Sequence, residues 1–117
     1  MKLPGPDHPI AIAPLGRHVT VRFAGAAIGE SDGALSLKEA NYPEVVYVPR
    51  GDLAMDRFSR TDKSTHCPYK GDATYFTVAA NGQRAENVAW SYEAPFPAMA
   101  EIRDCLAFYP GQIEIVS

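Results

Sequence analysis

Alternation between apolar and polar residues is the main pattern along this chain. In residues 18–23, which read His-Val-Thr-Val-Arg-Phe, every second residue is apolar, and this period is typical of a strand with one buried face. Similar alternation, or a run of β-branched residues, recurs between turn residues. The strands predicted in this way are 18–23, 26–30, 35–39, 45–48, 73–79, 86–92, 105–109 and 112–116.

Turn residues separate these strands and indicate how they pair. The Asn81-Gly82 dipeptide is the strongest hairpin signal, because both central residues of a type I′ turn need a positive φ. Short strands joined by tight turns favour antiparallel pairing. The sequence therefore predicts a mainly β fold, a compact antiparallel sandwich or barrel-like sheet with one or two short helices.

Two stretches depart from the period of two. Asp52 is placed to cap a short helix, either α or 3₁₀, that directs Leu53 and Phe58 inward. Residues 98–103 predict a second helix of a turn or two. Residues 59–64 are uniformly polar and are predicted to form a loop.

The N-terminal residues 1–17 are rich in proline, which fixes φ and removes a hydrogen-bond donor. We expect this segment to be an extended arm, with His8 exposed to solvent, and residues 18–117 to form one domain. The four prolines are Pro4, Pro6, Pro9 and Pro14.

Composition narrows the classes of function. The 117 residues, 46% hydrophobic and 21% charged, are ordinary for one globular domain. A net charge of −3 without a Lys/Arg cluster argues against nucleic acid as a partner. No apolar run approaches the ~20 residues that span a bilayer, and the N-terminus has no signal-peptide pattern. We therefore expect a cytoplasmic protein, monomeric or homodimeric, with no membrane partner.

Reactive side chains are most concentrated in residues 65–73, a stretch that also contains Pro68 and Gly71. Cys67 is a candidate nucleophile, because a nearby cation stabilises the reactive thiolate and a turn can bring Lys70 towards the sulfur. Lys70 is also a candidate anion-binding group. The alternatives are that Cys67 is a small buried apolar residue and that Lys70 is a solvated turn residue.

Glu39 and Arg50 are candidates at predicted strand ends. If Glu39 is buried without a partner, its raised pKa makes it a usable general acid or base. Arg50 has the planar fork that binds a carboxylate or phosphate of a ligand. The alternative for Arg50 is an ion pair with Glu39 or Asp52.

Aromatic residues supply a further candidate surface. Trp90 and Tyr92 share one strand face by the period of two, and Tyr47 from another strand can join them. Such residues either belong to the core or form a slot in which a ring or acyl chain stacks, so all three are candidate ligand-binding residues. His66, Cys67 and Cys105 do not supply four ligands at a zinc-like spacing, so no metal is predicted. Cys105 lies in an apolar run and is assigned to the core.

Several short motifs in combination resemble the DUF427 family over residues 19–109. The most specific are Cys-Pro-Tyr-Lys-Gly at 67–71 and Trp-Ser-Tyr at 90–92. The resemblance implies a small, mostly β domain of unknown function, known from bacteria and fungi. A nucleotidyltransferase label attached to the family implies that activity. The remaining motifs are Glu39, Tyr42-Pro43, 45–47, Pro49-Arg50-x-Asp52 and 107–109.

The residues themselves offer little support for nucleotidyl transfer. Such enzymes usually use a phosphate-binding loop and carboxylates that hold Mg²⁺. The chain has no G-x-x-x-x-G-K-[ST] or G-x-G-x-x-G motif, and the spacing of Glu39, Asp52 and Asp56 is not diagnostic.

The sequence therefore favours a module that binds a small anionic or aromatic ligand, with Arg50 and Lys70 as charge partners. No cofactor is identified. The alternatives are an enzyme that uses Cys67 as nucleophile or Glu39 as acid or base, and a nucleotidyltransferase.

Overall fold

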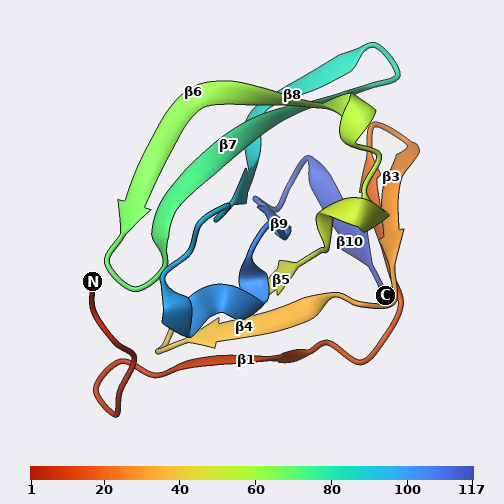
Figure 1. Cartoon of the computed structure of the whole chain (residues 1–117). Coiled ribbons are helices and arrows are strands. Elements are labelled where there is room, and N and C mark those ends of the chain that lie inside the picture. The colour runs from red at the N-terminus through yellow and green to blue at the C-terminus, as the bar shows by residue number, and fades with distance from the viewer.

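Three antiparallel sheets make up the protein in the computed structural model, which describes residues 1–117 (Figure 1). Their strand orders are β1-β4-β5, β10-β2-β3 and β6-β7-β8-β9. The strands are β1 Ile10–Pro14, β2 Val19–Phe23, β3 Ala26–Ser31, β4 Leu35–Glu39, β5 Val45–Tyr47, β6 Phe58–Cys67, β7 Gly71–Ala80, β8 Gln83–Ser91, β9 Leu106–Phe108 and β10 Ile113–Val116. The mainly β, antiparallel fold predicted from the alternation is thereby confirmed.

The four-stranded sheet has a hydrophobic core on each face. Side chains of successive residues in a strand point to opposite faces, so Tyr75 and Ala107 belong to one core while Phe76 and Leu106 belong to the other. The larger core packs this sheet against β10-β2-β3, and the smaller packs it against β4, β5 and a short helix. The two outer sheets therefore lie on opposite sides of β6-β7-β8-β9.

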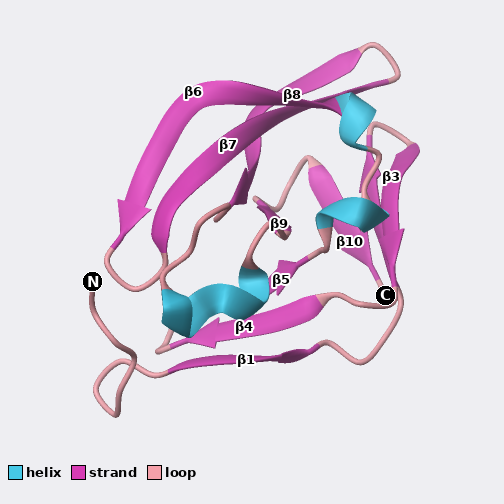
Figure 2. Ribbon diagram, in the orientation of Figure 1, coloured by secondary structure: helices cyan, strands magenta, loops and turns pink.

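Short 3₁₀ turns are the only helices (Figure 2). They are η1 Arg50–Asp52, η2 Met55–Arg57 and η3 Pro97–Ile102. Leu53 and Phe58 are buried as predicted, but Asp52 does not cap a helix; its carboxylate accepts a hydrogen bond from the Ser31 hydroxyl at 2.6 Å. None of these helices has the length and apolar character that crossing a membrane would require.

The β7–β8 hairpin turns at the predicted Asn81-Gly82 dipeptide. Both residues have positive φ, 50° and 75°, as a type I′ turn demands. Beyond the turn, the register of the hairpin shifts between Val78 and Phe76, and the shifted register places Tyr75 opposite Trp90.

The predicted loop at residues 59–64 is wrong, because these residues belong to strand β6. β6 is an edge strand that pairs with β7 alone, with an irregularity between Arg60 and Ser64. Almost all of its side chains are exposed or half-buried, so no apolar alternation was needed to form it. Backbone pairing with β7 holds the strand in place.

The proline-rich N-terminal segment is in part a strand rather than only an arm. β1 pairs with β4 in a register that sets Ile10 opposite Glu39. The expectation that His8 is exposed is also wrong. Its side chain is 26% exposed, and Nε2 lies 2.8 Å from Oε2 of Glu39.

Close contact between β3 and η1 gives a test of this packing. A Cβ added at Gly29 would lie 2.5 Å from Leu53 Cδ2 and 3.0 Å from the Asp52 carbonyl oxygen. We expect Gly29→Ala to lower the free energy of unfolding by about 1–3 kcal/mol, the usual cost of overpacking. Urea denaturation measures it. Gly51→Ala is the control, because no atom lies within 4 Å of its added Cβ; equal losses in both variants would contradict the predicted contact.

Candidate functional site

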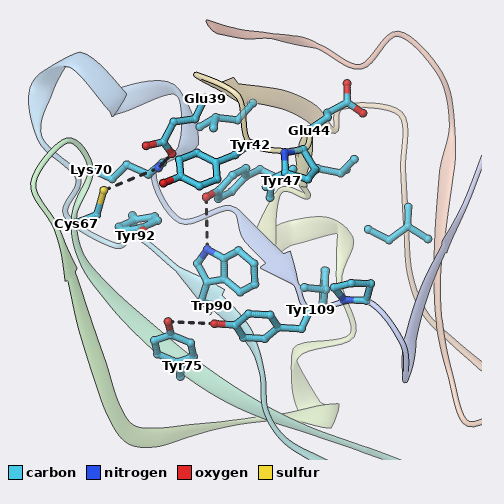
Figure 3. Close-up of a pocket in the computed structure, with 17 residues that line it drawn as sticks. Glu39, Tyr42, Glu44, Tyr47, Cys67, Lys70, Tyr75, Trp90, Tyr92 and Tyr109 are labelled. Carbon is cyan, nitrogen blue, oxygen red and sulfur yellow. Dashed lines mark hydrogen bonds and ion pairs between the residues drawn. The ribbon is translucent and has the colours of Figure 1, made fainter. Parts of the chain in front are cut away.

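A cavity of about 680 Å³ lies between β4-β5 and the β7-β8-β9 face of the four-stranded sheet (Figure 3). Most of its lining is hydrophobic, and seven of its lining residues are aromatic. Its ionisable lining groups other than the phenols are Glu39, Glu44, Lys70 and Cys67. The aromatic residues are Tyr42, Tyr47, Tyr75, Trp90, Tyr92, Phe108 and Tyr109.

The period of two in β7 and β8 brings the central aromatic residues to this cavity. Trp90 and Tyr92 point to the same side of the sheet, and cross-strand pairing sets Tyr75 directly opposite Trp90. Tyr47, at the end of β5, reaches the cavity from the facing sheet. The aromatic face expected from Tyr47, Trp90 and Tyr92 is therefore formed, and it borders a cavity as well as the core.

Hydrogen bonds and ring contacts fix these aromatic side chains. Trp90 Nε1 donates to the Tyr47 hydroxyl at 3.4 Å, and the hydroxyls of Tyr75 and Tyr109 lie 3.5 Å apart (Figure 3). The rings of Trp90 and Tyr109 have centroids 4.6 Å apart. Side chains held by both packing and hydrogen bonds give the cavity a preformed wall.

Three of the phenols that line the cavity stay protonated at neutral pH. Burial raises the pKa of Tyr47 to about 12 and also raises that of Tyr92. The hydrogen bond with Tyr75, together with burial, raises the pKa of Tyr109 to about 12. These hydroxyls therefore face the cavity as neutral groups that can donate a hydrogen bond.

At one end of the cavity, Lys70, Glu39 and Cys67 form a polar group. Lys70 is 6% exposed, and its ammonium donates to Glu39 Oε1 and lies 3.9 Å from the Cys67 sulfur. Partial burial alone would raise the pKa of Glu39, but hydrogen bonds from Lys70 and His8 outweigh it and hold that pKa below its usual range. Glu39 is therefore a carboxylate at neutral pH.

A tight turn between β6 and β7 brings Lys70 next to Cys67. The Lys70 amide donates to the Cys67 carbonyl at 3.3 Å. Gly71 follows with φ of 111°, a value that L side chains rarely adopt, and a Cβ added there would lie 3.5 Å from the Ala94 carbonyl oxygen. Pro68 and Gly71 thus belong to a turn that directs the Lys70 side chain into the protein.

The N-terminal segment covers this polar end from outside. The ring of His8 stacks on Tyr69, with centroids 4.2 Å apart and planes 7° from parallel. The Lys2 amide donates to the Pro68 carbonyl at 2.7 Å. Glu39 thus has Lys70 on one oxygen and His8 on the other.

Arg50 lies away from the cavity lining. Its guanidinium pairs with Glu93 at 3.0 Å, rather than with Glu39 or Asp52, the partners that the sequence suggested. Arg60 binds the same carboxylate at 2.6 Å. Hydrogen bonds from Arg60, opposed by partial burial and reinforced by Arg50, lower the pKa of Glu93 to about 2.

Of the seven candidates from the sequence, the structure brings six to one cavity, and Arg50 is the exception. Sequence reasoning missed Tyr75, which the alternation in β7 could have assigned to this face, and Tyr109, which follows β9. It also missed Tyr42 and Glu44, which lie in the exposed turn before β5 and carry no periodic signal.

The carboxylates considered as metal ligands do not converge. Asp52 binds Ser31, whereas Glu39 binds Lys70 and His8. No group of three or more His, Cys, Asp or Glu side chains lies close enough together to hold a metal ion. Cys105 is buried and free, and burial raises the pKa of its thiol.

The Glu93 ion pairs predict a pH dependence. Because the pKa of Glu93 falls from 4.5 to about 2 on folding, its stabilising effect is present above pH 4.5 and is lost as the pH falls towards 2. We expect Glu93→Gln to be less stable than the parent at pH 7 and to lose less stability between pH 4.5 and 2. Urea denaturation between pH 2 and 7 measures the free energy of unfolding of both proteins. Glu101→Gln, at an exposed glutamate in η3, is the control; a slope unchanged by Glu93→Gln would contradict the assignment.

The part of the chain that matches a known family contains strands of all three sheets and the residues that line the cavity. The family model for the domain of unknown function DUF427 matches residues 11–117, from β1 to the end of the chain. No curated protein matches the chain. The resemblance carried by residues 67–71 and 90–92 is thus confirmed, and both motifs contribute side chains to the cavity. The chain belongs to the DUF427 family.

Proposed function

We propose that the protein is a small-molecule-binding domain whose ligand occupies the aromatic cavity. The observation that carries this proposal is the convergence of seven aromatic residues on one cavity with a single buried ion pair at its end. Ligand sites are typically concave, mostly apolar, about 300–1,000 Å³ in volume, and supplied with a few polar groups. The cavity of about 680 Å³ has each of these properties.

The charges around the cavity favour an aromatic ligand over an anionic one. The Lys70 ammonium is already neutralised by Glu39, and Arg50 is held by Glu93 outside the cavity. The other charged lining group, Glu44, is an exposed carboxylate that accepts a hydrogen bond from Ser36. Rings that stack or meet edge to face are attracted to one another beyond the area that they bury.

A second candidate function is an enzyme with Cys67 as nucleophile. The observation that favours it is the 3.9 Å contact between the Lys70 ammonium and the Cys67 sulfur in the cavity wall. The ammonium stabilises a Cys67 thiolate less strongly than a free ammonium would, because it is also bound to the Glu39 carboxylate. Glu39 itself is a poor general acid, since its lowered pKa keeps it ionised at neutral pH.

The nucleotidyltransferase activity implied by the family label receives no separate support from the residues. A nucleoside triphosphate carries several negative charges, whereas the cavity has one cation that is already paired. The candidate carboxylates do not gather into a metal-binding group.

Protection of Cys67 from alkylation tests the proposed binding site. We expect 2-acetylnaphthalene, a flat aromatic probe, to slow the reaction of Cys67 with iodoacetamide by about threefold or more, because a bound ring would cover the thiol. Peptide mass mapping follows Cys67 and separates it from buried Cys105.

Two variants show whether the protection comes from the cavity. Val45 lines the cavity, so Val45→Trp should fill it and abolish protection, measured within that variant with and without probe. Val116 is 45% exposed and does not line the cavity, so Val116→Trp should retain protection. The absence of protection in the parent protein, or its persistence in Val45→Trp, would contradict the proposal.

The enzyme alternative predicts a different response to two other variants. If the ammonium activates Cys67, Lys70→Met should slow its alkylation, because a nearby cation stabilises the thiolate. Glu39→Gln should accelerate it, because the ammonium would no longer be shared with a carboxylate. Alkylation rates that are indifferent to both changes would leave Cys67 as a wall residue of a binding cavity.

A further inference from the structure

We infer that the ligand of this cavity is a neutral, planar aromatic molecule carrying a hydrogen-bond acceptor, such as a carbonyl oxygen. This inference rests on the proposed binding function and adds the chemical class of the ligand. It comes from the donors and acceptors that the protein leaves unmatched along the cavity wall.

Tyr92 contributes the first unmatched donor. Its side chain is 8% exposed, yet its hydroxyl makes no hydrogen bond with any protein group. The only fully buried side-chain nitrogen or oxygen without a partner is Ser91 Oγ, so the Tyr92 hydroxyl keeps accessible surface. Tyr92 lines the cavity, and we assign this accessible hydroxyl to the ligand space.

Tyr47 contributes a second unmatched donor. Its hydroxyl oxygen accepts a hydrogen bond from the Trp90 indole, which can only donate. The hydroxyl hydrogen of Tyr47 has no acceptor in the protein. Tyr47 is 2% exposed and its raised pKa keeps that hydrogen in place at neutral pH.

The polar end of the cavity adds a further donor. An ammonium has three N–H groups, and Lys70 directs one to Glu39 and another to the weakly accepting sulfur of Cys67. Both oxygens of Glu39 are engaged, one by Lys70 and the other by His8. The remaining Lys70 N–H therefore joins the two phenols as a donor without a strong acceptor.

A ligand that satisfies this wall must bring acceptors, because buried donors without partners are costly. The paired charges of Lys70 and Glu39 cancel locally, so a neutral acceptor is preferred to a carboxylate. An organic ammonium would add a second cation near Lys70 and would bring no acceptor for its remaining N–H. The rings of Trp90 and Tyr109 supply the surface on which a planar body would rest.

Four naphthalene probes with the same ring test this class. They are 2-acetylnaphthalene, 2-naphthoate, 2-naphthylmethylammonium and 2-ethylnaphthalene, compared by saturation-transfer NMR at one free concentration set by the solubility of the hydrocarbon. We expect 2-acetylnaphthalene to bind most tightly, by roughly three- to tenfold over 2-ethylnaphthalene, the range expected for one net hydrogen bond.

Removing single hydroxyls identifies the donors. Tyr92→Phe or Tyr47→Phe should weaken binding of 2-acetylnaphthalene by roughly three- to tenfold in at least one variant and leave 2-ethylnaphthalene unchanged. Tyr69→Phe is the matched control, because Tyr69 is half-buried but does not line the cavity. Both variants keep the ring, so the wall remains intact.

The possible results separate this inference from the proposed function. Equal binding of the ketone and the hydrocarbon, tighter binding of the naphthoate or the ammonium, or no effect of either tyrosine variant would overturn the ligand class while leaving a binding cavity. Failure of all four probes to bind would overturn the proposed function as well. The ketone preference, together with its loss in a tyrosine variant, would support the inference.

Discussion

The inner strands of the four-stranded sheet have a core on each face, and this constraint shapes the rest of the protein. β7 and β9 need apolar residues on both faces. One face packs against β10-β2-β3, and the other packs against β4, β5 and η3. The second face carries the aromatic side chains of Tyr75, Trp90 and Tyr92. A cavity remains where the aromatic wall of β7 and β8 meets β5.

The buried Lys70 ammonium links this wall to the edge of the neighbouring sheet. Removing an ammonium from water is costly unless it is paired, so the turn after β6 depends on Glu39 at the end of β4. Glu39 in turn receives His8 from the segment before β1. The Glu39 carboxylate thus connects three parts of the chain through its two partners, and its pair with Lys70 defines the polar end of the cavity.

Features set by local sequence were predictable. The period of two located β2, β4, β7 and β8, and the positive φ required by a type I′ turn located the Asn81-Gly82 hairpin. Strand β6 was not predictable from the period, because an edge strand with two largely exposed faces has no need of apolar alternation.

The ion-pair partners depended on topology rather than on local sequence. Arg50 and Glu93 are 43 positions apart, and Lys70 and Glu39 are 31 apart. Proximity along the chain suggested Asp52 for Arg50, but Asp52 binds Ser31 instead. The sequence could identify which side chains needed partners, whereas only the packing of the sheets decided which partners they met.

Trp90 has a consequence beyond its part in the wall. It is the only tryptophan in the chain, and its indole lies in the cavity, bonded to Tyr47 and against Tyr109. All intrinsic tryptophan emission of the protein therefore arises at this one place. The colour and lifetime of that emission report the polarity and occupancy of the cavity without any added label.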